Sequence, residues 1–391
     1  MIAEEFQLLL SCARSEPDSG SIKERVNKNL NWRKLIDLAK HHGVRPMLRQ
    51  SLKAVCWGYV PQETRIELDR FYETNAQRSL LFAGELLRLF AEFARACIPA
   101  ATFKGIILAQ SIYGDLSLRE FSDLDIIVHD ADASKVEDIL ANAGYIADFP
   151  DRDFRSAFLA YQGQYAFRNK QTGFSVDLHW RLSNKGEAFL VRSEDIWPRL
   201  EQVAICGRMV PSLAPDDLTL LLAAHGTKEG WKFLKWVCDF AEILRKCRNV
   251  DWVSVLARAE RSYCSRPLQL AMFLASTLLD APAPQQLIDK AQENPAVRAL
   301  AEKARSRLLC SGATGELTDF LNGLNTHDRI RHRLLPVATL LTTRTVGDYK
   351  AMPLPKSLWG LYYVTRPFRL AAKAAELVIP RTKTRFRFLM R

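Results

Sequence analysis

The sequence lacks a hydrophobic run long enough to cross a membrane. Its longest apolar stretches, such as residues 334–341, fall well short of the roughly 20 residues that a bilayer helix needs. The first residues, Met-Ile-Ala-Glu-Glu, are acidic where a secretion signal is basic, so we expect no export signal. With 48% hydrophobic and 25% charged residues, the composition is that of an ordinary globular protein.

Paired cysteines are also missing. The eight cysteines are scattered, with no C-x-x-C pair and no neighbouring histidine that would suggest a zinc site. This spacing argues against a disulfide framework as well. We therefore expect free thiols and a cytoplasmic location.

Three common enzyme fingerprints are absent. The chain has no G-x-S-x-G serine-hydrolase elbow, no G-x-x-x-x-G-K-[ST] phosphate loop and no dinucleotide-binding fingerprint. These absences weaken the competing classes of nucleotide-handling enzyme.

Charge is unevenly distributed along the chain. The net charge is +11, yet residues 331–391 alone hold thirteen Lys and Arg against two acids, so the remainder is balanced. Basic and apolar residues of this tail lie opposite each other at helical spacing: Arg366, Arg369 and Lys373 against Phe368, Ala371, Ala375 and Val378. Five further basic residues follow between Arg381 and Arg391. We expect a solvated tail, with weak contact to an anionic membrane or to RNA as alternatives.

Periodicity predicts an α+β fold. Residues 63–96 have helical spacing with no proline, and Pro99 ends that pattern. Residues 124–128 form a β-type run, and residues 165–168 and 174–180 flank a turn ending in Gly173, as in a hairpin. We expect a helical N-terminal region (1–97), a strand-containing core (98–210), a helical domain (211–325) and a basic tail (326–391).

Three aspartates point to metal-dependent chemistry. Asp123 and Asp125 share one face of a strand, about 7 Å apart. Asp177 lies on the polar face of the hairpin's second strand, opposite Val176 and Leu178. If the two strands are neighbours, three carboxylates could hold two divalent cations roughly 3.5–4 Å apart. The alternative for D-x-D alone is a solvated turn before a strand.

Cationic and polar residues surround this motif. Lys104-Gly105 occupies a strand-to-helix turn, where glycine lets backbone N–H groups approach a phosphate. Arg119 stands four residues before Asp123 and could reach the same phosphates. His179 shares the polar face of Asp177, as either a substrate contact or a structural histidine. His225 and Asp239 are expected to pack between helices, with a place in the active-site wall as the alternative. A solvated helical face is expected for Lys228, Lys232 and Lys235, with the nucleotide pocket as the alternative.

Three blocks together resemble a known family. Phe-Lys-Gly-Ile-Ile-Leu-Ala (103–109), Leu-Arg-Glu-Phe-Ser-Asp-Leu-Asp-Ile-Ile-Val (118–128) and Val-Asp-Leu-His-Trp (176–180) are similar to the uncharacterised bacterial nucleotidyltransferases of the DNA polymerase β superfamily. Further likeness lies in Leu-Ala-Ala-His-Gly (222–226), in 231–239 and in 361–367. The resemblance covers most of the chain.

The resemblance implies a small mixed-sheet nucleotidyltransferase core flanked by helical regions. It assigns Asp123, Asp125 and Asp177 as metal ligands and catalytic residues, with Asp177 also helping to deprotonate the acceptor hydroxyl. It also places four residues around the triphosphate of the nucleotide: Lys104, Gly105, Arg119 and Ser122. One departure stands out, since Ile106 replaces the small or hydroxyl residue that usually follows the glycine.

The expected function is transfer of an NMP from an NTP, such as ATP, to a hydroxyl or phosphate of a small molecule, peptide or protein. Mg²⁺ or Mn²⁺ would be the cofactor. Two alternatives stay open: a toxin-like transferase that modifies tRNA or protein, and a scaffold that binds a nucleotide or partner without turnover.

Overall fold

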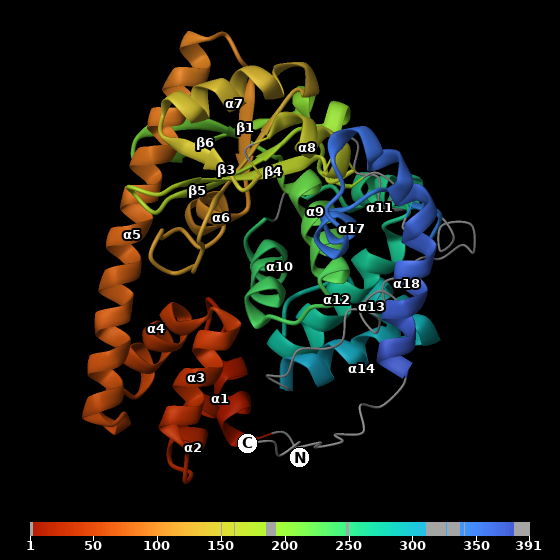
Figure 1. The fold of residues 1–391 in the computed structure, drawn as a ribbon. Coiled ribbons are helices and arrows are strands. Elements are labelled where there is room, and N and C mark those ends of the chain that lie inside the picture. The colour runs from red at the N-terminus through yellow and green to blue at the C-terminus, as the bar shows by residue number, and fades with distance from the viewer. Residues whose placement is uncertain are drawn as a thin grey trace, which may run out of the picture.

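The computed structural model describes residues 3–149, 151–159, 161–184, 193–247, 250–309, 326, 337–339 and 341–378, with side chains up to residue 372 in the last segment. It confirms the expected α+β fold (Figure 1). Among the described helices, none combines the length and apolar character needed to cross a bilayer.

The N-terminal region consists of helices. Its elements are α1 (Glu4–Cys12), α2 (Ser19–Val26), α3 (Trp32–His42), α4 (Arg45–Val55), η1 (Trp57–Tyr59) and α5 (Gln62–Arg95). Gly43 ends α3 in the left-handed conformation, with φ at 66°, as its position after the helical pattern predicts. The long α5 runs from these helices up to the sheet (Figure 1), and its bounds lie within one residue of the expected run.

Seven strands form one mixed sheet in the order β3-β4-β5-β2-β1-β7-β6. They are β1 (Ala100–Phe103), β2 (Leu124–Val128), β3 (Tyr145–Ala147), β4 (Gln164–Asn169), β5 (Ser175–His179), β6 (Glu201–Ile205) and β7 (Arg208–Ser212). The hairpin β4–β5 is antiparallel, whereas β2 and β5 run parallel. In the described part of the chain, three helices and three 3₁₀ turns lie between the strands: α6 (Gly105–Ser111), η2 (Asp130–Asp132), α7 (Ala133–Asn142), α8 (Arg152–Phe158), η3 (Ser193–Asp195) and η4 (Trp197–Arg199).

The two faces of the sheet pack against different partners. Ile126, Val176 and Leu178 belong to a core with Phe82 and Phe93 of α5. On the opposite face, buried residues of β1 and β2 join a larger core that contains the N-terminal and C-terminal helices. Because side chains alternate along a strand, Asp125, Asp177 and His179 face this second side.

The C-terminal part of the described chain is again helical. Its elements are α9 (Pro215–Lys228), α10 (Leu234–Lys246), α11 (Trp252–Arg261), α12 (Ser265–Leu279), α13 (Gln285–Glu293), α14 (Pro295–Leu309), α17 (Val346–Ala351), η5 (Lys356–Leu361) and α18 (Tyr362–Val378).

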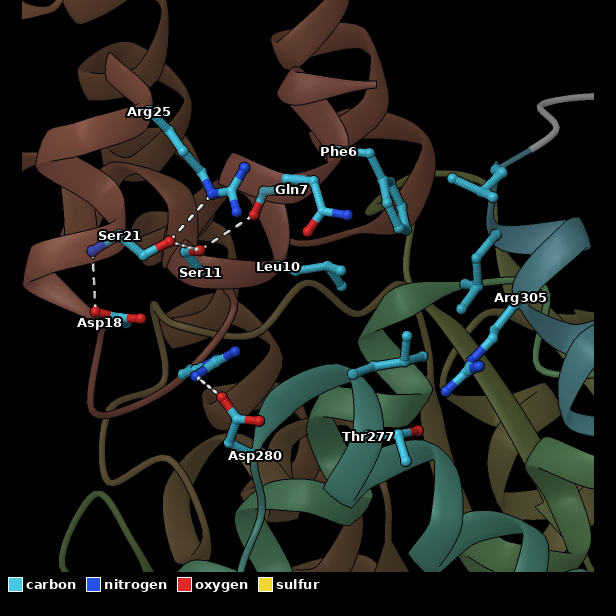
Figure 2. Close-up of a pocket in the computed structure, with 14 residues that line it drawn as sticks. Phe6, Gln7, Leu10, Ser11, Asp18, Ser21, Arg25, Thr277, Asp280 and Arg305 are labelled. Atoms are coloured by element: carbon cyan, nitrogen blue, oxygen red, sulfur yellow. Dashed lines mark hydrogen bonds and ion pairs between the residues drawn. The ribbon is translucent and has the colours of Figure 1, made fainter. Parts of the chain in front are cut away.

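A cavity of about 450 Å³ separates α1 and α2 from α12 and α14 (Figure 2). Arg14 and Asp280 both line this cavity and form an ion pair at 2.5 Å. Arg25 donates from Nε to the Ser21 hydroxyl at 3.0 Å and also pairs with Glu4. These cations are therefore engaged in joining helices.

The helix α18 differs from the expected solvated basic face. Arg366 is 1% exposed and forms an ion pair with Asp348 of α17, and Arg369 Nε donates to the same carboxylate at 2.7 Å. Asp348 thus draws both arginines inward, and Tyr362 beside them packs on Phe158 of α8. The basic residues from Arg381 to Arg391 lie outside the described residues, as does the side chain of Lys373.

Candidate active site

Parallel pairing of β2 with β5 sets the geometry of the acidic cluster. Asp125 and Asp177 are direct partners in the register of these strands. His179, two residues along β5, lies with Nε2 3.2 Å from Asp125 Oδ1. Ligand atoms of Asp125, Asp177 and His179 all lie within 4.8 Å of one another, so one cation could contact all three.

All eight residues expected at the site line one cavity of about 290 Å³: Lys104, Gly105, Arg119, Ser122, Asp123, Asp125, Asp177 and His179. Asp123 precedes β2 and faces the cavity without joining the 4.8 Å group. The structure therefore brings together segments that are more than 50 residues apart in the sequence. The cluster that could hold a cation includes His179, for which the sequence left open a substrate contact or a structural role.

The turn between β1 and α6 is strained. Lys104 has a φ of 57° and a ψ of −144°, a conformation that costs a residue with a Cβ on the order of 1–3 kcal/mol. Its Nζ lies 3.8 Å from Asp125 Oδ1. At Gly105, where φ is 28°, an added Cβ would come within 3.3 Å of the Asp123 carbonyl oxygen. The turn at Lys104 and Gly105 therefore lies close to Asp123 and Asp125.

Ile106 turns away from the cavity. Its side chain is buried in the core between the sheet and α5, with Phe121 and Leu124 among the residues of that core. The departure from the family pattern at this position therefore removes a hydroxyl without filling the cavity.

Arg119 is held by a partner that the sequence did not reveal. Its Nε and one NH group each donate to the Asp239 carboxylate of α10 at 2.8 Å. The other NH group reaches the Gly105 carbonyl oxygen at 3.4 Å, and Tyr113 donates to Asp239 at 3.0 Å. Asp239 is fully buried and Arg119 nearly so. The pair fastens α10 to the turn that carries Lys104 and Gly105.

Helices α9 and α10 close the cavity with cationic and aromatic groups. Lys228, Lys235 and Trp236 line it, although the sequence favoured a solvated face for the lysines over the nucleotide pocket. Burial lowers the pKa of Lys235, as does the neighbouring charge of Arg119. His225 lines the same wall and packs edge-on against Trp236 at 5.3 Å. Lys232, in contrast, is exposed and pairs with Glu229.

Gln164, in the first strand of the hairpin, also lines the cavity but was not predicted from the sequence. Gln164 of β4 lies beside Asp177, and its Nε2 donates to Asp177 Oδ2 at 3.4 Å. An uncharged side chain in a strand has no distinctive spacing, so only the antiparallel pairing of β4 with β5 reveals it.

The pKa values of the three carboxylates shift in different directions: that of Asp125 is lowered, and those of Asp123 and Asp177 are raised. Burial would raise the pKa of Asp125, but Lys104 and the hydrogen bond from His179 lower it to about 2. For Asp177, burial and then the charges of Asp125 and Asp123 raise the pKa to about 7. Burial and Asp125 also raise the pKa of Asp123. Negative charge is thus concentrated where a divalent cation would relieve the repulsion.

Comparison with known proteins identifies one family. A family model described as uncharacterised nucleotidyltransferase matches residues 28–280, a range that includes the whole cavity. No curated protein matches the sequence. Among solved structures, the solution structure of the antibiotic-resistance factor ANT(2'')-Ia is 14% identical and covers 59% of this chain and 94% of that chain, with a TM-score of 0.29. So loose a superposition carries no argument about function.

Proposed function

From the premise that this chain belongs to the uncharacterised nucleotidyltransferase family, we propose that it transfers an NMP from an NTP to a hydroxyl or phosphate of a small molecule, peptide or protein. The observation that supports this activity most directly is the register of Asp125 with Asp177 beside Asp123, in a cavity lined with lysines. We place the reaction in the cytoplasm because the seven described cysteines are free thiols.

Asp123, Asp125 and Asp177 would hold Mg²⁺ or Mn²⁺, which supplies charge neutralisation for the triphosphate and activates the attacking oxygen. Asp177 lines the same cavity and would also help to take the proton of the acceptor hydroxyl. The acceptor oxygen then bonds to the α-phosphorus while the bond from that phosphorus to the bridging oxygen breaks, and pyrophosphate leaves. His179 is a candidate substrate contact that also orients Asp125.

The cations of the cavity provide sites for the leaving pyrophosphate. Lys104 projects from the strained turn, with Gly105 and Ser122 on the same wall, and Lys228 and Lys235 face them from α9 and α10. Such charges stabilise the developing negative charge best in a cavity shielded from water. Arg119 contributes positive charge there, and its bonds to Asp239 and to the Gly105 carbonyl position the turn.

Calorimetric titration with each NTP, with and without Mg²⁺ or Mn²⁺, tests the proposal. We expect metal-dependent binding that Asp123→Asn/Asp125→Asn abolishes. The matched control is Asp130→Asn/Asp132→Asn, a second D-x-D only five residues further on that lies outside the cavity and should bind like the wild type.

Turnover is then measured as pyrophosphate release with candidate acceptors. If folded wild type binds no NTP, the transferase proposal is wrong and the partner-binding scaffold takes its place. Growth arrest on expression that Asp123→Asn removes would instead point to the toxin-like transferase.

A further inference from the structure

The outer face of the C-terminal helix is apolar and uncovered in the described part of the chain. Leu361, Val364 and Phe368 follow at i, i+3 and i+7, and are 47%, 63% and 74% exposed. Leu358 and Tyr363 are exposed beside them. We call these five residues, of which Leu358 and Leu361 belong to η5 and the other three to α18, the α18 apolar face. Figure 1 shows α18 at the periphery, on the opposite side of the view from α5.

Contacts of the inner face fix this orientation. Arg366 and Arg369 are bound to Asp348, and Tyr362 is buried against α8. Turning the apolar face inward would expose Tyr362 and leave the Asp348 carboxylate without its two partners. Because leaving such a buried charge unpaired is costly, the helix holds its aliphatic side chains outward.

Contiguous exposed apolar surface usually marks an interaction site. The sequence that follows α18 is positively charged, since residues 381–391 contain Arg381, Lys383, Arg385, Arg387 and Arg391 and no acid. We propose that the α18 apolar face and this basic segment dock together on an anionic membrane surface. The apolar side chains would enter the boundary between headgroups and acyl chains, and the cations would contact acidic headgroups.

Charge and side-chain chemistry favour this occupant over two others. A second copy of the chain would bring two tails together, each with a net charge of +11 over residues 331–391, and so would be repelled. Single-stranded RNA is bound through aromatic stacking, whereas most of the exposed face is aliphatic: Leu358, Leu361 and Val364. Anionic lipid satisfies both the aliphatic face and the positive charge.

Co-sedimentation of the full chain with vesicles tests the proposal. We expect binding to vesicles that contain phosphatidylglycerol, weaker binding at high salt, and little binding to pure phosphatidylcholine. Val364→Glu/Phe368→Glu should weaken binding by at least about tenfold, because two apolar anchors are lost and two negative charges are added. Arg385→Glu/Arg387→Glu should weaken it severalfold.

Leu80→Glu/Leu81→Glu on α5 is the matched control, since these residues are 57% and 63% exposed on another helix. This variant should bind vesicles like the wild type. The inference is overturned if wild type does not sediment with anionic vesicles, or if the α5 variant loses as much binding as the α18 variant. It is also overturned if Val364→Glu/Phe368→Glu leaves vesicle binding unchanged but abolishes a dimer seen by light scattering, or if single-stranded RNA binds through Phe368 while vesicles do not.

Discussion

Lys104 has a strained backbone that destabilises the fold but directs its ammonium group into the cavity. Its positive φ is a conformation that glycine adopts without cost, yet the position carries a lysine whose Nζ approaches Asp125. A glycine would relieve the backbone and remove the charge from the cavity. The backbone strain at residue 104 therefore accompanies the placement of the lysine ammonium group near Asp125.

Two substitutions separate these effects. Lys104→Gly and Lys104→Ala both remove the ammonium group, so both should weaken NTP binding. Only glycine relieves the backbone, and we expect Lys104→Gly to be more stable than Lys104→Ala by about 1 kcal/mol or more. Urea denaturation of the two variants measures this difference, and equal stability would show that the turn is not strained.

Individual site residues were predictable where spacing within one segment carried the signal. Asp123 with Asp125, and Asp177 with His179, follow from strand alternation alone. The partner of Arg119 did not follow, because Asp239 lies 120 residues further along the chain and joins it only through tertiary packing. The sequence likewise could not show that Asp348 holds Arg366 and Arg369 inward.

At the scale of elements, the Arg119–Asp239 pair links α10 to the turn before α6. Asp239→Asn should lower the free energy of unfolding by about 3–5 kcal/mol, because a buried arginine loses its counter-charge. Arg119→Met/Asp239→Leu should recover much of that loss, since neither charge remains. Denaturant unfolding compares the variants, with Lys232→Ala on an exposed pair as a control that stays within about 0.5 kcal/mol.

NTP binding by the double variant measures what the Arg119 charge and the positioning of the turn contribute together. If the pair contributes to the proposed nucleotide site through its charge or through its contact with the Gly105 carbonyl, Arg119→Met/Asp239→Leu should bind NTP more weakly even where its stability has recovered. Unchanged NTP affinity would limit the pair to a purely structural role.

Two helical glycines give opposite expectations for the same change. Gly84 is exposed in the middle of α5, with nothing within 4 Å of an added Cβ, so Gly84→Ala should stabilise the protein by about 0.5–1 kcal/mol. Gly226 in α9 would place a Cβ 2.6 Å from the buried Trp231 ring, so Gly226→Ala should destabilise it by about 1–3 kcal/mol. Thermal unfolding distinguishes them, and destabilisation at both sites would contradict the packing of α5.

For the molecule as a whole, local patterns predicted the helices and central strands well. Residues 124–128 match β2, and the hairpin lies where its turn residues indicated. The wall formed by α9 and α10 was predicted only as an alternative, since lysines at helical spacing look the same on a solvated face as over a cavity. Which face of a helix is covered depends on distant elements, and the register of β2 with β5 is equally non-local.

The cavity is lined by residues of the sheet and of α9 and α10, which come together only in the folded protein, so a bound ligand should stabilise the folded state. NTP with Mg²⁺ at a hundredfold excess over Kd should stabilise the folded state by about 2.7 kcal/mol. Differential scanning fluorimetry should show an upward shift in Tm that Asp123→Asn/Asp125→Asn loses. A shift that persists in that variant would place the nucleotide elsewhere.

The parallel pairing of β2 with β5 also has a kinetic meaning. Asp125 and Asp177 face one another only after a non-local strand pairing that closes a loop of about 50 residues, a slow class of folding event. A chain that has formed its helices and its β4–β5 hairpin, but not this pairing, has no cluster of carboxylates to offer. The proposed cation affinity would therefore arise only when β2 pairs with β5, so the appearance of metal binding during refolding would report that pairing.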